Sequence, residues 1–121
     1  MKILDVQWDD DNFTEINTHG VTIKEFEEIC YGLHFSKPDS PITKGGKQRY
    51  PSGKKRFILQ GRTSGNKYLD VIIEQLYDSY YRAVTAYIMS DKYKAICAER
   101  ISNIERHRSE NKYEENHRTE E

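Results

Sequence analysis

Residues 55–89, KRFILQGRTSGNKYLDVIIEQLYDSYYRAVTAYIM, decide the fold, because they hold three apolar stretches separated by short polar turns. The stretches are Lys55–Arg62, Tyr68–Leu76 and Tyr80–Met89. The second stretch alternates with the period of two that is typical of strands, with Leu69, Val71 and Ile73 on one face. Because the turns are short, the segment predicts an antiparallel meander of three strands.

Upstream of the meander, the alternating residues of Met1–Trp8 predict another strand, which is followed by a short helix. Asp9 has the position of a helix N-cap. Trp8 and Phe13 have the spacing of a hydrophobic staple, which makes Trp8 a core residue. Gly20 is a good residue to end this helix.

A second helix is predicted after Thr22, because Thr22 and Glu25 have the spacing of a capping box. Apolar residues then recur at helical spacing. They are Ile23, Phe26, Ile29, Cys30 and Leu33.

A C-terminal helix is predicted after Ser90, where Tyr93, Ile96, Cys97, Ile101 and Ile104 recur at helical spacing. Residues 109–121 are acidic with Tyr113 as their one apolar residue, and they predict a disordered tail. The prediction is therefore a single α+β domain over residues 1–108. It consists of an antiparallel sheet with two short N-terminal helices and a C-terminal helix packed on it.

Charge is unevenly distributed, although the 121 residues carry a formal net charge of −1. Residues 1–36 contain two basic and eight acidic residues, whereas residues 37–67 contain nine basic residues and one acid. The segment 37–54 also holds all three prolines, which predicts a loop.

Basic residues in this loop and at the start of the meander are candidates to bind RNA phosphates, because such contacts supply most non-specific affinity for nucleic acid. They are Arg49, Lys54, Lys55 and Arg56. Two alternatives are that these side chains are simply solvated, or that they face acidic residues of this chain or of a protein partner.

Several classes of protein are excluded by the sequence. No apolar run approaches the roughly 18–20 residues that span a bilayer, so no membrane association is predicted. Cys30 and Cys97 are far apart and fall on apolar helix positions, which predicts buried thiols in a reduced, cytoplasmic protein. Neither metal-ligand spacing nor a phosphate-cradling glycine motif is present, so no metal or cofactor is predicted.

Four short motifs, taken in order, resemble the BrnT toxins. They are WDDDN at 8–12, INTHGVT at 16–22, FILQGRT at 57–63 and RAVTA at 82–86. The resemblance implies a RelE-like fold and the toxin of a type II toxin–antitoxin system. It also implies a metal-independent endoribonuclease that is neutralised, in a complex of more than one chain, by a small ribbon-helix-helix antitoxin encoded nearby.

The same resemblance implies that Arg62 and Arg82 stabilise the phosphate during RNA cleavage, a task that suits the planar, permanently charged guanidinium. This sequence departs from the family after Ala86, where Tyr87 occupies the position of an arginine. Tyrosine can donate a proton or stack on a base but cannot replace the charge, so weakened activity is expected.

Alternatives remain open at this point. Arg62 and Arg82 either bind phosphate or pair with acids such as Glu74 or Asp70 across the sheet. His19 could serve as a general base, but its place before Gly20 favours an imidazole that caps helix carbonyls. The chain as a whole could also be a catalytically inert binding module of the same fold that acts through an antitoxin or RNA contact, or an unrelated α+β interaction protein.

Overall fold

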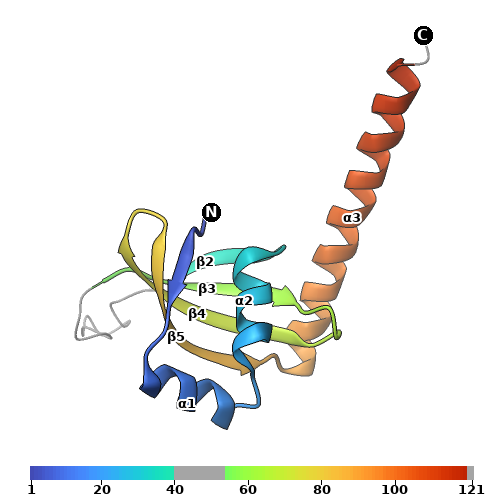
Figure 1. Cartoon of the computed structure of the whole chain (residues 1–121). Helices are drawn as coiled ribbons and strands as arrows, with labels where there is room; N and C mark the ends of the chain where they lie inside the picture. The colour runs from blue at the N-terminus through green and yellow to red at the C-terminus, as the bar shows by residue number, and fades with distance from the viewer. Residues whose placement is uncertain (40–53, 120–121) are drawn as a thin grey trace, which may run out of the picture. The chain divides into compact units, whose positions relative to one another are not determined.

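The computed structural model describes residues 1–39 and 54–119, with side chains as far as residue 108. In chain order the elements are β1 (Asp5–Gln7), α1 (Asp10–Thr18), α2 (Ile23–Tyr31), β2 (Phe35–Asp39), β3 (Arg56–Arg62), β4 (Tyr68–Tyr77), β5 (Tyr80–Ile88) and α3 (Asp91–Thr119) (Figure 1). The predicted α+β class is confirmed.

The five strands form one mixed sheet in the order β1-β5-β4-β3-β2. The strands β2 to β5 pair antiparallel in succession, so the predicted meander is confirmed. In contrast, β1 pairs parallel with β5, with Val6 opposite Tyr81, and the sheet is therefore not wholly antiparallel as predicted. Alternation in a sequence predicts which side chains share a face, whereas strand direction depends on how the intervening chain returns to the sheet.

The edge strand β2 begins at Phe35 and includes Lys37 and Pro38, which the sequence placed at the start of a loop. Pro38 lies opposite Phe57 of β3. Proline lacks a backbone N–H, but an edge strand tolerates it because one side of that strand forms no ladder. The rest of the predicted loop, residues 40–53, lies outside the described residues.

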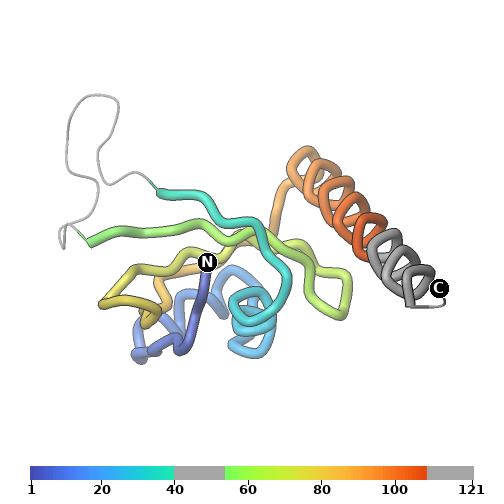
Figure 2. Tube along the Cα trace, turned by 90° about the horizontal axis from the view of Figure 1, so that it is seen from above, coloured from blue at the N-terminus to red at the C-terminus, as the bar shows by residue number. Residues whose placement is uncertain are grey.

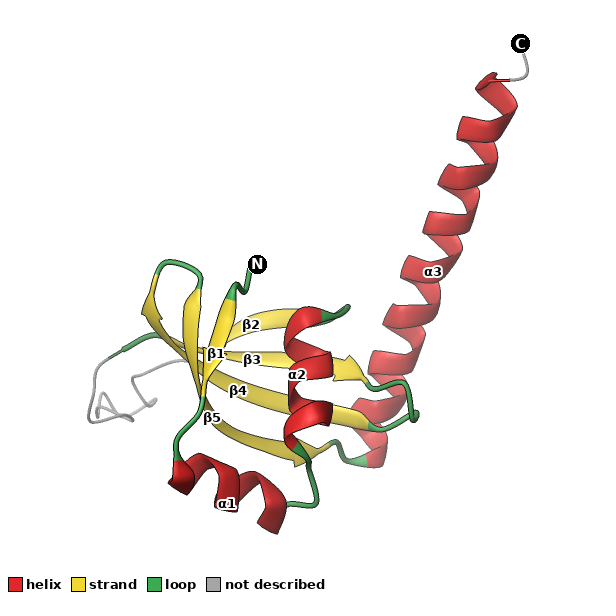
Figure 3. Ribbon diagram, viewed as in Figure 1, coloured by secondary structure: helices red, strands yellow, loops and turns green. Residues whose placement is uncertain are grey.

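One face of the sheet is covered by α2, which packs against β3 and β4, while α1 lies beside β5 on the same side (Figures 2 and 3). The core lies between these helices and the sheet. Its largest fully buried side chains are Phe26, Ile16, Ile29, Leu59, Leu69, Ile73, Val21 and Val71. Gly61 permits close contact of β3 with α2, since a Cβ there would lie 3.1 Å from Cδ1 of Ile29.

The predicted starts of the two N-terminal helices are confirmed. The Asp9 side chain accepts a hydrogen bond of 2.9 Å from the backbone N–H of Asn12. At α2, the Thr22 hydroxyl accepts from the Glu25 backbone N–H, and the Glu25 carboxylate accepts from the Thr22 N–H at 2.9 Å. These local bonds satisfy N–H groups that have no partner within the helix.

The predicted staple is also present. The ring of Trp8 lies 5.8 Å from that of Phe13 and 4.6 Å from that of Phe26, measured between centroids. The indole N–H of Trp8 donates to Glu27 at 3.2 Å. Trp8 therefore anchors the start of α1 against α2, as a partly buried aromatic side chain with a polar partner can do.

The chain divides into two compact units, Met1–Met89 and Ser90–Glu121. The second unit contains α3, which continues to Thr119 and includes most of the segment 109–121 for which a disordered tail was predicted. Lack of apolar residues suggested disorder, but the segment contains five glutamates, which have high helix propensity. A single domain over residues 1–108, with the C-terminal helix packed on the sheet, stays a prediction.

Candidate nucleic-acid interface

The face of the sheet opposite to α2 carries alternate residues of β3, β4 and β5, and many of them are polar. We call it the polar face. It consists of Arg56, Ile58, Gln60 and Arg62 on β3, their partners Glu74, Ile72, Asp70 and Tyr68 on β4, and Arg82, Thr85 and Tyr87 on β5. All three predicted catalytic residues and one predicted RNA-binding arginine lie on this face.

Glu74 joins two arginines from neighbouring strands. Its Oε2 accepts a hydrogen bond of 2.8 Å from Nε of Arg56, and its Oε1 lies 3.4 Å from Nη2 of Arg82. The Glu74 side chain is 3% exposed, that of Arg56 16% and that of Arg82 31%. A buried carboxylate requires a cation beside it. Arg56 supplies the short bond, while Arg82 keeps a longer contact and more solvent exposure.

Residues at the start of α1 also contact the Arg82 guanidinium, through its other terminal nitrogen. Its Nη1 lies 3.5 Å from Oδ1 of Asn12 and 3.7 Å from Oδ2 of Asp9. Asn12 is buried, and its Nδ2 donates to the carbonyl of Val84 at 3.0 Å. The side chain of Asn12 thus fastens α1 to β5 and places an acceptor beside the Arg82 guanidinium. We call Arg56, Glu74, Arg82, Asn12 and Asp9 the Glu74 cluster.

Arg62 and Arg82 lie at opposite ends of the polar face. Arg62 ends β3 opposite Tyr68, whereas Arg82 lies near the start of β5 opposite Glu74. The stretch of β4 from Tyr68 to Glu74 corresponds to roughly 20 Å, at about 3.3 Å per residue. The structure therefore does not bring the two predicted catalytic arginines together. A meander predicts this separation, because its first and third strands run in the same direction.

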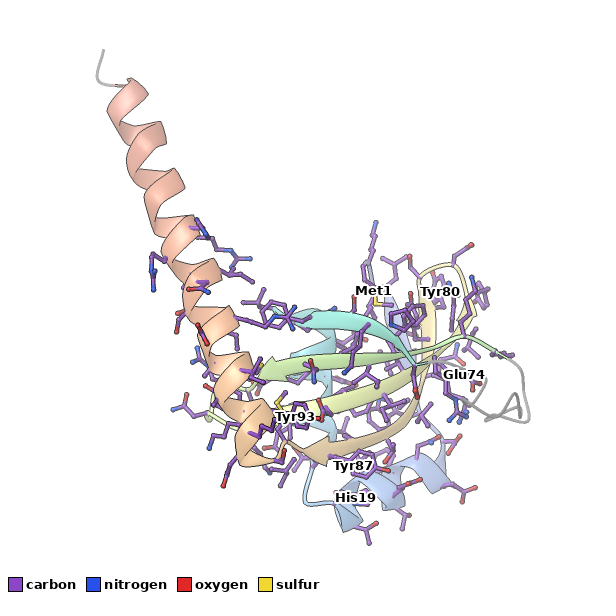
Figure 4. The ribbon with its side chains drawn as sticks, turned by 180° about the vertical axis from the view of Figure 1, so that it is seen from behind. Met1, His19, Glu74, Tyr80, Tyr87 and Tyr93 are labelled. Atoms are coloured by element: carbon purple, nitrogen blue, oxygen red, sulfur yellow. The ribbon has the colours of Figure 1, made fainter. Side chains whose placement is uncertain are left out.

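Tyr87 lies at the same end of the sheet as Arg62, opposite Asp70. Its side chain is 42% exposed, and its ring packs on the imidazole of His19 with 4.6 Å between centroids (Figure 4). Nε2 of His19 lies 3.9 Å from the Glu15 carboxylate. Tyr87 is thus grouped with His19 at the edge of β5 and lies away from the Glu74 cluster.

The predicted capping role of the His19 imidazole is wrong. The backbone N–H of His19 makes the helix-end bond, to the carbonyl of Ile16 at 3.1 Å, while the ring packs on Tyr87. The chain turns immediately afterwards at Gly20, whose φ of +76° suits glycine. An imidazole does meet a helix-end carbonyl at α2, where Nδ1 of His34 lies 2.8 Å from Ile29 O.

The predicted RNA-binding residues Lys54 and Lys55 are exposed and lie immediately before β3. The Lys55 carbonyl accepts a hydrogen bond of 2.8 Å from the backbone N–H of Gln75, the residue that follows Glu74 on β4. The described part of the basic segment therefore lies near Arg82 and far from Arg62. Arg49, the remaining predicted contact, falls outside the described residues.

Within the ranges 1–39 and 54–108, no three His, Cys, Asp or Glu side chains gather so as to hold a metal ion. Burial raises the pKa of the Cys30 thiol, which favours an unreactive packing role. The described helices also lack the combination of length and apolar character that crossing a bilayer requires.

Comparison with known proteins adds no family assignment: no protein-family model matches the chain, and no curated protein matches it. The BrnT resemblance therefore stays a prediction from the motifs.

Proposed function

We propose that this chain is the toxin of a type II toxin–antitoxin system, of BrnT-like type, and acts in the cytoplasm as a weak, metal-independent endoribonuclease. The observation that supports the proposal best is the partly exposed guanidinium of Arg82. It lies on the polar face beside a buried carboxylate, at the end of the sheet where the basic segment enters.

In the proposed reaction the 2′-hydroxyl of RNA loses its proton and attacks the adjacent phosphorus. The bond from phosphorus to the 5′-oxygen breaks, and that oxygen gains a proton. The products are a 2′,3′-cyclic phosphate and a 5′-hydroxyl. Arg82 stabilises the negative charge that gathers on the phosphate oxygens, which is the step for which a fixed cation is most useful.

We propose separate roles for the other predicted residues. Lys54, Lys55 and Arg56 contact the RNA backbone close to Arg82, because they lie at the same end of the sheet. Arg62, roughly 20 Å away, contacts a different part of the same RNA. Tyr87 offers an exposed ring on which an unpaired base can stack.

Expression of the chain alone in a bacterial host tests this proposal. Growth arrest with loss of bulk RNA is expected for the wild type and is expected to disappear in Arg82→Ala. Lys24→Ala is the control, because it removes one exposed positive charge from α2 and leaves the polar face intact. Normal growth at high expression of the folded chain would contradict the proposal.

We assign the neutralising partner to a small ribbon-helix-helix antitoxin encoded beside the toxin. Co-expression of the neighbouring short open reading frame should restore growth and yield a complex of more than one chain on gel filtration. A genome that holds no such reading frame beside this one would count against the toxin assignment.

A second candidate is a catalytically inert binding module of the same fold. The observation that favours it is the charge balance of the Glu74 cluster, where Arg56 and Arg82 face Glu74 and Asp9. Two cations facing two carboxylates, counted among the described residues, leave little surplus charge for a phosphate. Tight binding of RNA or of the antitoxin, without any cleavage product, would favour this module over the ribonuclease.

A further inference from the structure

Glu74 makes contacts of unequal length with Arg56 and Arg82. Its bond to Nε of Arg56 is 2.8 Å long, which is the usual length for a charged hydrogen bond. Its contact with Nη2 of Arg82 is 3.4 Å, and the Arg82 side chain is about twice as exposed as that of Arg56. One carboxylate therefore makes a short bond to Arg56 and a longer contact with Arg82, whose guanidinium stays accessible to solvent.

Asn12 completes the arrangement around Arg82. Its amide is fixed by the bond from Nδ2 to the Val84 carbonyl, so its Oδ1 has a defined position 3.5 Å from Nη1 of Arg82. Glu74 and Asn12 thus approach the two terminal nitrogens of the same guanidinium. Both are buried, at 2% and 7% exposure, which keeps them in place while Arg82 faces solvent.

From these contacts we infer that Glu74 and Asn12 are positioning residues, which hold the Arg82 guanidinium in the orientation that receives an RNA phosphate. Arg56 serves mainly to compensate the buried Glu74 charge and only secondarily to meet RNA. This inference rests on the proposed function, because it assigns Arg82 the phosphate contact. It adds that the orientation of Arg82, and not only its charge, determines turnover.

Glu74→Gln tests the inference, because glutamine keeps the shape of the side chain but carries no charge and one acceptor oxygen. Loss of a negative charge should leave RNA affinity equal to or up to about fivefold tighter than that of the wild type. Loss of orientation should lower kcat by about 10- to 100-fold. If Glu74 had a merely structural role, Glu74→Gln would change the free energy of unfolding but would not combine unchanged or tighter RNA binding with a lower kcat.

Asp70→Asn is the matched control. Asp70 lies on the same strand and the same face as Glu74, is likewise bonded to a β3 side chain, and accepts from Gln60 Nε2 at 3.0 Å. The change removes the same charge from the same face while leaving Arg82 and its contacts intact, so kcat should fall by a factor about fivefold or more smaller in Asp70→Asn than in Glu74→Gln. Urea unfolding of both variants shows that each is folded under the assay conditions.

A second arm distinguishes failure of the inference from failure of the ribonuclease proposal. The probe is a mixed-sequence 2′-O-methyl RNA 10-mer, which has no free 2′-hydroxyl and cannot be cleaved. The ¹⁵N-detected side-chain signal of Arg82 should shift on saturation in the wild type and in Asp70→Asn, and shift less in Glu74→Gln and in Asn12→Ala.

The outcomes are then separable. Absence of cleavage by the wild type, together with the expected Arg82 shifts, would overturn the ribonuclease proposal and support the positioning role in binding. An Arg82 signal that does not move with bound RNA would overturn the positioning role. So would a kcat of Glu74→Gln that equals that of Asp70→Asn.

Discussion

The carboxylate of Glu74 is 3% exposed and accepts a hydrogen bond of 2.8 Å from Nε of Arg56. Removing one partner of a buried ion pair leaves the other charge uncompensated, so Glu74→Ala should lower the free energy of unfolding by about 3–5 kcal/mol. Urea denaturation measures this change. Asp70→Ala, which removes a half-buried carboxylate from the same face, should cost about 1 kcal/mol. Equal losses in the two variants would contradict the assigned role of the Glu74 pair.

The contact of β3 with α2 predicts a cost for a side chain at Gly61. A Cβ there would lie 3.0 Å from the Leu33 carbonyl oxygen and 3.1 Å from Cδ1 of Ile29. Gly61→Ala should therefore destabilise the protein by about 1–3 kcal/mol, as overpacking does. Gly65→Ala is the control, because the nearest atom to its Cβ would be 3.8 Å away. If Gly61→Ala lowers stability no more than Gly65→Ala does, β3 and α2 are packed less closely than these distances imply.

The capping box of α2 predicts a pH dependence of stability. Burial raises the pKa of Glu25, but hydrogen bonds from Thr22 and Lys67 outweigh this effect, and the net pKa is lowered. The unfolded chain then binds more protons than the folded one, so stability rises with pH. The contribution is complete above the unfolded pKa of about 4.3 and is lost as pH falls through the lower folded value.

Glu25→Gln should therefore flatten the rise of stability with pH in the acid range, as measured by urea unfolding at a series of pH values. Lys24→Gln removes a neighbouring charge from the same helix without removing a carboxyl, and should leave the rise unchanged. Parallel curves for Glu25→Gln and the wild type would show that the capping box does not favour the ionised carboxylate.

Tyr87 occupies the position where the BrnT resemblance expects an arginine, and it lies exposed beside His19. Tyr87→Arg should increase any rate of RNA cleavage, because it returns a cation to the polar face. Tyr87→Gln, which removes the ring without adding charge, should give no gain. If the rate measured with a labelled RNA is the same for both variants, this end of the polar face does not contact the reacting RNA.

Salt dependence tests the role of the basic residues before β3. Each phosphate contact with single-stranded RNA contributes about 0.7 to the slope of log affinity against log salt. Lys54→Ala and Lys55→Ala should each reduce that slope by roughly this amount, while Lys24→Ala on α2 should not. A slope that none of the three variants changes would place the RNA elsewhere on the protein.

Features encoded within a few residues were predictable from the sequence. The capping box at Thr22 and Glu25, the cap at Asp9 and the staple of Trp8 with Phe13 depend on bonds and contacts within one turn, and all are present. The meander was also predictable, because short turns force antiparallel neighbours.

Features that depend on segments far apart in the sequence were not predictable from it. The parallel pairing of β1 with β5 depends on the course of the helices and strands that lie between them in the sequence. A proline such as Pro38 is compatible both with a loop and with an edge strand, so the sequence alone did not assign it to β2. Glu74 was recognised as an alternative partner of Arg82, and that contact is present. Its simultaneous contact with Arg56 required the register of three strands.

The most direct test of the central claim is cleavage of a defined single-stranded RNA by the purified chain in the presence of a metal chelator. We expect slow cleavage by the wild type to products with 2′,3′-cyclic phosphate and 5′-hydroxyl ends, and a rate about 100-fold lower for Arg82→Ala. Absence of cleavage by the wild type, or an equal rate for folded Arg82→Ala, would contradict it.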